Sequence, residues 1–381
     1  MRNNNIEIMG TLCVSYKENK EKNNSQKKEN QRKFSFGDTM NNLNNQTNIE
    51  KKEDKNLNKN KKTKIFKNEE KNIEYKIKRI CGKGFYTKVY ECYILNDNSN
   101  EFYALKTISK KILTTNQEKK SIEHMEKELE LLKSLKSKYI IEIKDNFKIT
   151  LENNIKRPFI IYPYYNLDLF SLIKQTNKNI PLNFIKLILH DVYMSISYLH
   201  KEKIIYRDLK PENIVIDLNE GRCILIDFGL SKKINEKDEL SELCGTNQYI
   251  PPEVILGKKY NFDFDYWTFG IFCYEIVFGF PPFRGSNQKE IFFFFFECNI
   301  NFSKKENLSN EIKDLIMYLL KKEKEERMEW INIPYHPFFK GIDFNINNLN
   351  DNLNQRNEFK SFLNKYKNTF YFVIDEQNIK K

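Results

Sequence analysis

Two polar stretches of this sequence carry side chains that could do chemistry. The run Tyr206–Asn213 sets an acid (Asp208), a base (Lys210) and an amide (Asn213) within one loop, and Asp227 follows a short apolar run typical of a strand. A carboxylate such as Asp208 can take the proton of an acceptor hydroxyl, and an ammonium such as Lys210 can neutralise a phosphoryl group in transit. Asn213 and Asp227 offer hard oxygen ligands for Mg²⁺. The set predicts phosphoryl transfer from Mg-ATP.

The order and spacing of these residues resemble the catalytic and metal-binding loops of protein kinases. Matching motifs run over about residues 75–344 of the 381. The resemblance implies an α+β fold of two lobes, a small lobe rich in β-strands and a larger helical lobe, with the nucleotide bound between them. It further implies ATP and Mg²⁺ as cofactors, and proteins as the substrates that receive the phosphoryl group.

The chain before the catalytic loop supplies a glycine-containing turn in the order expected of this family. An alternating strand from Tyr75 leads into Gly82 and Gly84, which let a backbone turn lie close over phosphates. Val89 is expected to cover the adenine. The usual third glycine is replaced by Thr87, a departure that predicts a stiffer hairpin or an altered affinity for ATP.

Further ATP-binding residues follow on a strand, a helix and a linker. The strand carries Ala104 and ends in Lys106, which the resemblance assigns to the α- and β-phosphates. A helix expected over about 118–135 carries Glu128, the residue we predict to pair with Lys106 rather than to be one of several surface glutamates. Asp168, at the start of the helix after the linker, falls where related kinases have an acid near the ribose and the substrate.

Departures within the motifs place the resemblance in the AGC group of kinases, most similar to the catalytic domains of cyclic-AMP- and cyclic-GMP-dependent kinases. Tyr206 stands where most kinases have histidine, and the stretch Leu243–Glu253 resembles Leu-Cys-Gly-Thr-Pro-Glu-Tyr-Leu-Ala-Pro-Glu. The resemblance implies that Arg207 couples the activation segment to the catalytic loop. It also implies that Asp265 caps the backbone of that loop.

The same resemblance predicts two side-chain links within the larger lobe. Thr246 is expected to bridge Asp208 and Lys210, the pair that handles the transferred group. Glu253 is expected to pair with Arg327 and so hold the end of the activation segment. The first link belongs to the reaction and the second to the stability of the lobe.

Glu242 occupies the position at which this family has a threonine that is phosphorylated for activity. A phosphothreonine carries about −1.5 to −2 charge and three acceptor oxygens, whereas a glutamate carries one charge and two oxygens. The resemblance places Arg207, His124 and Lys232 around this position. We predict that Glu242 partly replaces the phosphate. The alternative is that the neighbouring Ser241 is phosphorylated instead.

Acidic residues at the expected peptide groove predict substrates with Arg or Lys upstream of the target residue. Glu212, Glu275 and Asp168 match such positions, while Gln248 replaces a further acid of the family. The segment Arg32–Phe36, Arg-Lys-Phe-Ser-Phe, fits this pattern and is a candidate autophosphorylation site.

Composition divides the chain into three parts. Residues 1–72 are rich in Asn and Lys, with 17 Lys and Arg against 10 Asp and Glu, and are predicted to be disordered. The resemblance implies that residues 73–340 form the kinase domain and that 341–381 fall where the AGC group has a tail that wraps the small lobe. Two pairs of aromatic residues in the tail are candidates for docking there: Phe359 with Phe362, or Phe370 with Phe372.

Charge, cysteines and hydropathy bound the possible partners and location. The net charge of +12 is not accompanied by zinc-finger spacing or an RNP-type aromatic motif, so no nucleic-acid partner is expected. Seven scattered cysteines suit a reducing compartment, and we expect a cytoplasmic location with nuclear entry left open. The most apolar stretch, 267–283, is interrupted by Glu275, Gly279 and two prolines, which favours a buried helix over a membrane span. Control by cyclic nucleotides would require a separate regulatory subunit.

A scaffold with the same fold but no turnover is the competing class of function. Such a pseudokinase would act by docking, for example through the phenylalanine run Phe292–Phe296, which is otherwise explained as part of a helix wedged into the large lobe. An active kinase is favoured because the full catalytic set is present: Lys106, Glu128, Asp208, Lys210, Asn213 and Asp227.

Overall fold

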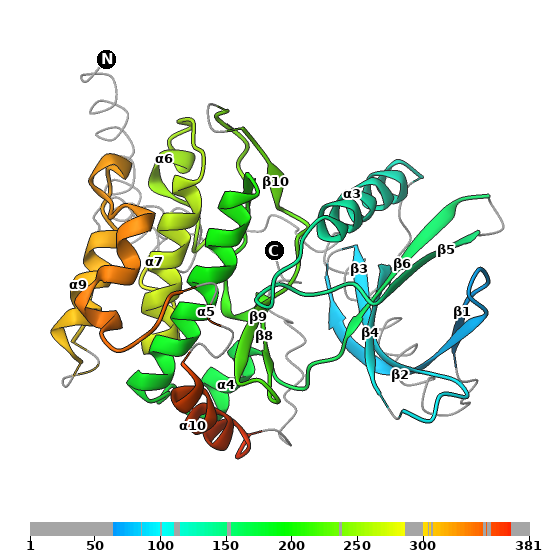
Figure 1. Ribbon diagram of the computed structural model, residues 1–381. Coiled ribbons are helices and arrows are strands. Elements are labelled where there is room, and N and C mark those ends of the chain that lie inside the picture. Colours follow the sequence, from blue (N-terminus) through cyan, green and yellow to red (C-terminus); the bar gives the residue numbers. More distant parts are fainter. Residues whose placement is uncertain are drawn as a thin grey trace, which may run out of the picture. The chain divides into compact units, whose positions relative to one another are not determined.

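A computed structural model describes residues 64–366 except 85, 100, 110–114, 151–153, 236–237, 286–299, 304, 306–307, 346–347 and 349–351. The predictions for the segment Arg32–Phe36, for Phe292–Phe296 and for Phe370 and Phe372 lie outside these residues. The described part contains a lobe built on a β-sheet and a lobe built of helices (Figure 1), which confirms the predicted α+β architecture of two lobes.

The small lobe is a six-stranded antiparallel sheet in the order β1-β2-β3-β4-β6-β5. Its strands are β1 (Ile65–Asn68), β2 (Ile73–Lys83), β3 (Thr87–Ile94), β4 (Tyr103–Ile108), β5 (Asp145–Thr150) and β6 (Lys156–Pro163). Rings and branched side chains of alternate residues, such as Tyr75, Leu105 and Phe159, form the buried core of this sheet. The alternation expected from Tyr75 onward therefore reflects one buried face.

Strand β1 corrects the predicted boundary of the disordered segment, because residues 65–72 form a strand and a turn. The buried carboxylate of Asp145 on β5 accepts hydrogen bonds from Asn68 (2.9 Å), Tyr75 (2.8 Å) and the ammonium of Lys71. A buried charge must be paired, and these donors fix the incoming chain against the sheet. Composition alone does not reveal this partner, since it lies 77 residues from Asn68.

Helix α3 (Thr115–Lys133) packs on the sheet beside β6 and begins three residues before its predicted start. Met125, Leu129 and Leu132 on one face are buried in the main core of the molecule. Glu128 lies on the same inward side and is also buried. The helical spacing of these apolar residues thus sets the direction in which Glu128 points.

The large lobe surrounds a helix that is apolar on nearly every side. Its helices are α4 (Leu169–Gln175), α5 (Leu182–Lys201), α6 (Pro252–Ile255), α7 (Asp263–Phe278), α9 (Asn310–Leu319) and α10 (Leu353–Leu363). In α7 all residues from Trp267 to Phe278 are buried, and the helix ends at Gly279 in a left-handed conformation with φ 74°. No helix of the described residues is both long and apolar enough to cross a membrane.

Short strands hold the functional loops of the large lobe. They are β7 (Ile204–Ile205), β8 (Ile214–Asp217), β9 (Arg222–Leu225) and β10 (Lys232–Lys233), of which β8 pairs with β9 and β7 with β10. The catalytic loop lies between β7 and β8. Asp227 follows β9, so one hairpin separates it from Asn213.

Helix α10 corrects the predicted path of the C-terminal tail. Phe359 and Phe362 lie on the large lobe, where their rings pack on Phe184 of α5 with centroids 5.2 and 4.9 Å apart, and Figure 1 shows α10 beside α5. The prediction that these two residues dock on the small lobe is wrong. The buried carboxylate of Asp191 on α5 requires the guanidinium of Arg356, which draws α10 to this helix.

Candidate active site

The backbone of the catalytic loop is held by hydrogen bonds to a side chain in the first turn of α7. Asp265, fully buried, accepts hydrogen bonds from the N–H groups of Tyr206 and Arg207, both at 2.9 Å, as expected from the sequence. Its carboxylate also lies 2.8 Å from Nε2 of His200. Arg207 is thereby held at φ 70°, a conformation that non-glycine residues adopt only when their surroundings impose it.

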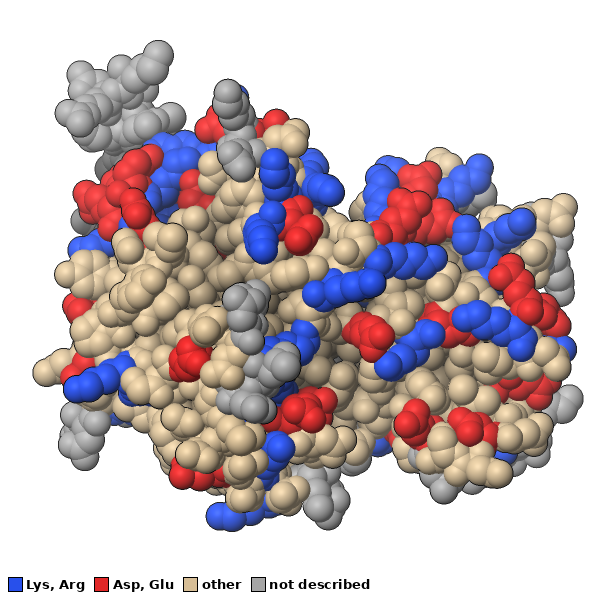
Figure 2. All heavy atoms as spheres, in the orientation of Figure 1, with Lys and Arg blue, Asp and Glu red and all other residues tan. Residues whose placement is uncertain are grey.

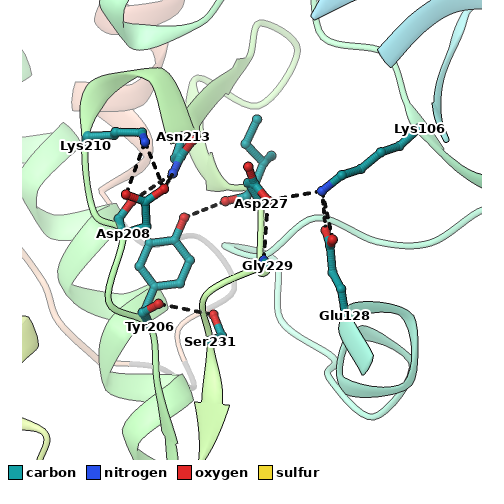
Figure 3. Close-up of polar contacts among 10 residues, drawn as sticks. Lys106, Glu128, Tyr206, Asp208, Lys210, Asn213, Asp227, Gly229 and Ser231 are labelled. Atoms are coloured by element: carbon teal, nitrogen blue, oxygen red, sulfur yellow. Dashed lines mark hydrogen bonds and ion pairs between the residues drawn. The ribbon is translucent and has the colours of Figure 1, made fainter. Parts of the chain in front are cut away.

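The carboxylate of Asp208 is oriented by three donors, of which Figure 3 shows Lys210 and Asn213. Lys210 Nζ lies 3.1 and 2.9 Å from its two oxygens, and the hydroxyl of Thr246 donates to Oδ1 at 2.9 Å. The side-chain amide of Asn213 donates to Oδ2 at 2.9 Å and to the Asp208 carbonyl at 2.8 Å. Lys210 also donates to Thr246 at 3.1 Å, so the expected bridge between Asp208, Lys210 and Thr246 is present. A carboxylate held in this way can accept the proton of an incoming hydroxyl.

A second cluster, on the small-lobe side, centres on Lys106. Its ammonium lies 2.7 and 2.8 Å from the oxygens of Glu128 and 3.1 Å from Oδ1 of Asp227 (Figure 3). Burial opposes the charge of Lys106, but the carboxylates of Asp227 and Glu128 hold its pKa above the usual range. The charge of Lys106 in turn lowers the pKa of Asp227. The contact expected between Lys106 and Glu128 is thus present, in a site whose burial raises the pKa of Glu128 while the charge of Lys106 lowers it.

Asp227 is held in an uncommon backbone conformation at the end of β9. Its φ is 60°, and Oδ1 accepts a hydrogen bond from the N–H of Gly229 at 3.4 Å. The hydroxyl of Tyr206 donates to the carbonyl of Ile226 at 2.6 Å, which anchors the residue before it. Tyr206, whose ring packs against Phe228, therefore also positions the chain at Asp227.

The glycines of the β2–β3 turn are explained by close approach. A Cβ on Gly84 would lie 2.7 Å from Oγ1 of Thr87, and one on Gly82 would lie 3.3 Å from Cβ of Val89, its partner in the β2–β3 pair. The N–H of Gly84 donates to the carbonyl of Thr87 at 2.9 Å. Thr87, in place of the third glycine, therefore closes this turn. Ala104 faces Tyr162 across the β4–β6 pair, at the start of the linker between the lobes.

Asn213 and Asp227 fit a divalent cation that is shared with a nucleotide. The amide nitrogen of Asn213 makes both bonds to Asp208, which leaves its oxygen to meet a cation. Within the described residues no group of three or more His, Cys, Asp and Glu could hold a metal by itself. Mg²⁺ is commonly bound by one or two protein oxygens together with substrate phosphates and water. This donor set matches that mode.

The carboxylate of Glu242 is shared by two cations of the activation segment and the catalytic loop. Oε2 lies 2.9 Å from Nη1 of Arg207, and Oε1 lies 2.6 Å from Nζ of Lys232. Hydrogen bonds from Lys232 and Arg207 lower the pKa of Glu242. His124 lies on the exposed side of α3 without a hydrogen bond to Glu242, and Ser241 is exposed. Two of the three expected cations therefore meet this carboxylate.

Tyr260 is a residue of this cluster that the sequence did not reveal. Its fully buried hydroxyl donates to the carbonyl of Glu242 at 2.8 Å and accepts from Nη1 of Arg207 at 3.1 Å. Its backbone also exchanges both hydrogen bonds with Leu240. Tyr260 lies outside the recognised motifs, and no periodic pattern marks it.

The acids expected at the peptide groove have different surroundings. Glu275 is buried on α7 and accepts a short hydrogen bond from Tyr249, and its burial raises its pKa to about 7. Glu212 is exposed beside the catalytic loop. Asp168 caps α4, where it accepts from the N–H of Ser171 at 2.7 Å and from its hydroxyl at 2.6 Å.

The link between the activation segment and the rest of the large lobe is a buried bidentate ion pair. Arg327 donates to the two oxygens of Glu253 at 2.7 and 2.6 Å, as expected from the sequence. Both side chains are nearly inaccessible to solvent. The pair therefore belongs to the core of the lobe rather than to its surface.

The architecture and these two charged clusters are those of a protein kinase, and the protein kinase domain model matches residues 75–339. The chain belongs to the protein kinase family. It is 30% identical over 305 residues to the serine/threonine-protein kinase sgk-1 of Caenorhabditis elegans. The aligned region covers 79% of this chain and 61% of the relative. The RAC family serine/threonine-protein kinase homolog of Dictyostelium discoideum is 29% identical, with coverages of 71% and 59%.

A third relative is the cAMP-dependent protein kinase type 3 of Saccharomyces cerevisiae, which is 30% identical over 71% of this chain and 65% of its own length. The resemblance to the AGC group is thus confirmed, with nearly equal identity to several of its types. The chain spans about three fifths of the length of these relatives.

Proposed function

We propose that this chain is a serine/threonine protein kinase that transfers the γ-phosphoryl group of Mg-ATP to hydroxyls of proteins. The observation that carries the proposal is the connected pair of charged clusters. Lys106 is paired with Glu128 and Asp227, and Asp208 is oriented by Lys210 and Thr246. A scaffold without turnover does not require Asp208 to be oriented by several donors, nor a second acid, Asp227, nearby to bind a cation.

Each side chain then has one task in the reaction. Lys106 binds the α- and β-phosphates, and Asn213 and Asp227 hold Mg²⁺, which neutralises phosphate charge when bound. Asp208 orients the acceptor hydroxyl and takes its proton, and Lys210 offsets the charge of the transferred group. Since this transfer depends on positioning and electrostatics, the fixed geometry around Asp208 is the main contribution of the protein.

We further propose that Glu242 does part of the work of an activation-segment phosphate. The proposal is supported by its contacts with Arg207 and Lys232, because Arg207 adjoins Asp208 in the catalytic loop. The carbonyl of Glu242 is also tied to Tyr260, which contacts Arg207. A single carboxylate can in this way fix the segment on which Thr246 is carried.

Glu242→Gln is expected to lower the rate of phosphate transfer by about tenfold, because it removes the negative charge from two charge-assisted hydrogen bonds. The effect is no larger because Glu242 is exposed, and solvent weakens such bonds. The measurement is transfer from Mg-ATP to an Arg-Arg-x-Ser-Leu type peptide by protein without activation-segment phosphate. Glu239→Gln, an exposed acid of the same segment paired at 3.4 Å with Lys259, is the matched control and should retain activity. Full activity of Glu242→Gln would contradict this role, and a gain of wild-type activity on phosphorylation that Ser241→Ala lacks would favour phosphorylation of Ser241 instead.

We also propose that Glu275 and Glu212 select basic residues upstream of the target. Burial raises the pKa of Glu275 to about 7, so the charged form that attracts an arginine becomes dominant only above that pH. A cationic peptide should therefore bind more tightly as pH rises and release a proton on binding.

The affinity for an Arg-Arg-x-Ser-Leu type peptide is expected to rise by about tenfold between pH 6 and pH 8, since the ionised fraction of a group with pKa about 7 changes by that factor. The measurement is the peptide dissociation constant at each pH. Glu275→Gln should lose this dependence, and a peptide with alanine in place of both arginines should not show it. A wild-type affinity that does not vary with pH would rule Glu275 out as a contact of the basic residues.

A further inference from the structure

The carboxylate of Asp191 on α5 joins three elements of the large lobe. Its oxygens accept hydrogen bonds from Arg356 on α10, at 2.7 and 3.1 Å, and from the N–H of Cys223 on β9, at 2.8 Å. Oδ1 also lies 2.9 Å from Nδ1 of His190. Asp191 and Arg356 are both almost fully buried, and the Arg356 guanidinium holds the pKa of Asp191 at about 2 despite burial. The pair therefore stays charged at any physiological pH.

Helix α10 also lies directly on the turn between β8 and β9. Arg356 Nη1 donates to the carbonyl of Gly221 in that turn at 3.0 Å. Gly221 has φ 61°, and a Cβ there would lie 3.0 Å from the carbonyl oxygen of Arg356 and from Cγ of Lys360. Glycine meets both the backbone conformation and this close approach without strain. Phe359 and Leu363 lie on the same face of α10 as Arg356 and have no exposed surface, so they also fix the helix on the lobe.

The hairpin held by α10 carries the two residues assigned to the metal at its open end. Asn213 directly precedes β8, and Asp227 lies two residues beyond β9. The N–H of Ile226 donates to the carbonyl of Asn213 at 2.9 Å, so the hairpin joins these two sites rigidly. Movement of its turn therefore shifts Asn213 and Asp227 together relative to Lys106, which lies 3.1 Å from Asp227. Groups that orient metal ligands in this way commonly change metal affinity by 10- to 100-fold when they are altered.

We propose that α10 is a brace that positions the metal-binding hairpin, with Arg356 and Gly221 as positioning residues for Mg-ATP. This inference rests on the proposed function, since it concerns the nucleotide of that reaction. Loss of the brace lets the hairpin shift Asn213 and Asp227 away from their positions opposite Lys106 and so weakens binding of the metal-bound nucleotide. Binding of ATP without metal, which depends on the small lobe and Lys106, is affected much less.

The test uses the full chain and compares Gly221→Ala with Gly257→Ala. Both glycines have a positive φ, 61° and 68°, but a Cβ on Gly257 would meet nothing within 4 Å. The two variants therefore share the backbone strain and differ in the collision with α10. We expect Gly221→Ala to raise the dissociation constant of Mg-ATP by about tenfold and Gly257→Ala to leave it unchanged. The dissociation constant of ATP in EDTA should stay within about twofold of wild type for both.

Arg356→Lys provides a second variant that keeps the positive charge beside Asp191 and loses the bidentate geometry. It should weaken Mg-ATP in the same metal-dependent manner as Gly221→Ala. The proposal is contradicted if both variants melt at a lower temperature than wild type while their affinities for Mg-ATP and for metal-free ATP remain those of wild type. Because the readout is nucleotide binding, a failure of the proposed transfer activity would show separately, in the peptide assay.

Discussion

Asp208→Asn is expected to lower kcat by about 10²- to 10⁴-fold, the usual contribution of a positioned general base. The substituted amide is close to the carboxylate in shape. Its oxygen can still accept from Asn213, and the Thr246 hydroxyl can turn to accept from its NH2 group, while the capacity to take a proton is lost. The nucleotide cluster around Lys106 lies on the other side of the site, with Asp227 between them. Affinity for Mg-ATP should therefore remain near that of wild type.

The measurement is single-turnover transfer to the basic peptide together with nucleotide binding by the same protein. Asp97→Asn, an exposed acid in the turn between β3 and β4 that bonds only Ser99 among the described residues, is the matched control and should transfer phosphate at the wild-type rate. Retention of more than about a tenth of the rate by Asp208→Asn would contradict its role as the base. A wild-type chain that binds Mg-ATP tightly and transfers nothing would favour the scaffold class instead.

Arg327→Met is expected to destabilise the folded chain by about 3–5 kcal/mol, the cost of leaving one partner of a buried ion pair uncompensated. Glu253 would then keep its charge in a site that is nearly closed to water. Met fills a volume similar to that of the aliphatic part of Arg, so packing loss contributes little. The result should appear as a lower midpoint in chemical denaturation with a similar slope.

Two further variants separate the ion pair from packing. Lys259→Met removes the exposed pair with Glu239 and should change the free energy of unfolding by less than about 1 kcal/mol. The double variant Glu253→Gln with Arg327→Met removes both charges and should be more stable than Arg327→Met alone. If the double variant is no more stable than the single one, the loss comes from packing and not from the unpaired carboxylate.

The parts of the site predicted from the sequence are those in which neighbouring residues act together. Asp208, Lys210 and Asn213 lie in one loop, so their spacing alone places their side chains close together. The longer links, from Lys106 to Glu128 and from Thr246 to Asp208, followed from resemblance to related kinases. Their presence in the structure shows that the motifs keep the spatial arrangement as well as the order.

The parts that were missed depend on single contacts between distant residues. Arg356 and Asp191 are 165 residues apart, and nothing in the local pattern around either one marks its partner. Tyr260 acts through one hydroxyl, which leaves no periodic signal. Analogy with related kinases predicts a tail on the small lobe, whereas the buried Asp191 on α5 fixes α10 on the large lobe. Burial of a charge is a property of the folded chain and is invisible in composition.

Strand β1 and helix α10 also determine the limits of a catalytic fragment that can fold stably. The kinase domain model matches residues 75–339 and so ends short of both elements. A fragment with those limits would deprive Asp145 of Asn68 and Lys71, and Asp191 of Arg356, leaving two buried carboxylates without their main donors. A fragment that keeps β1 and α10 whole, and with them these donors, runs at least from Ile65 to Leu363. Recombinant work on this catalytic domain should take those residues as its limits.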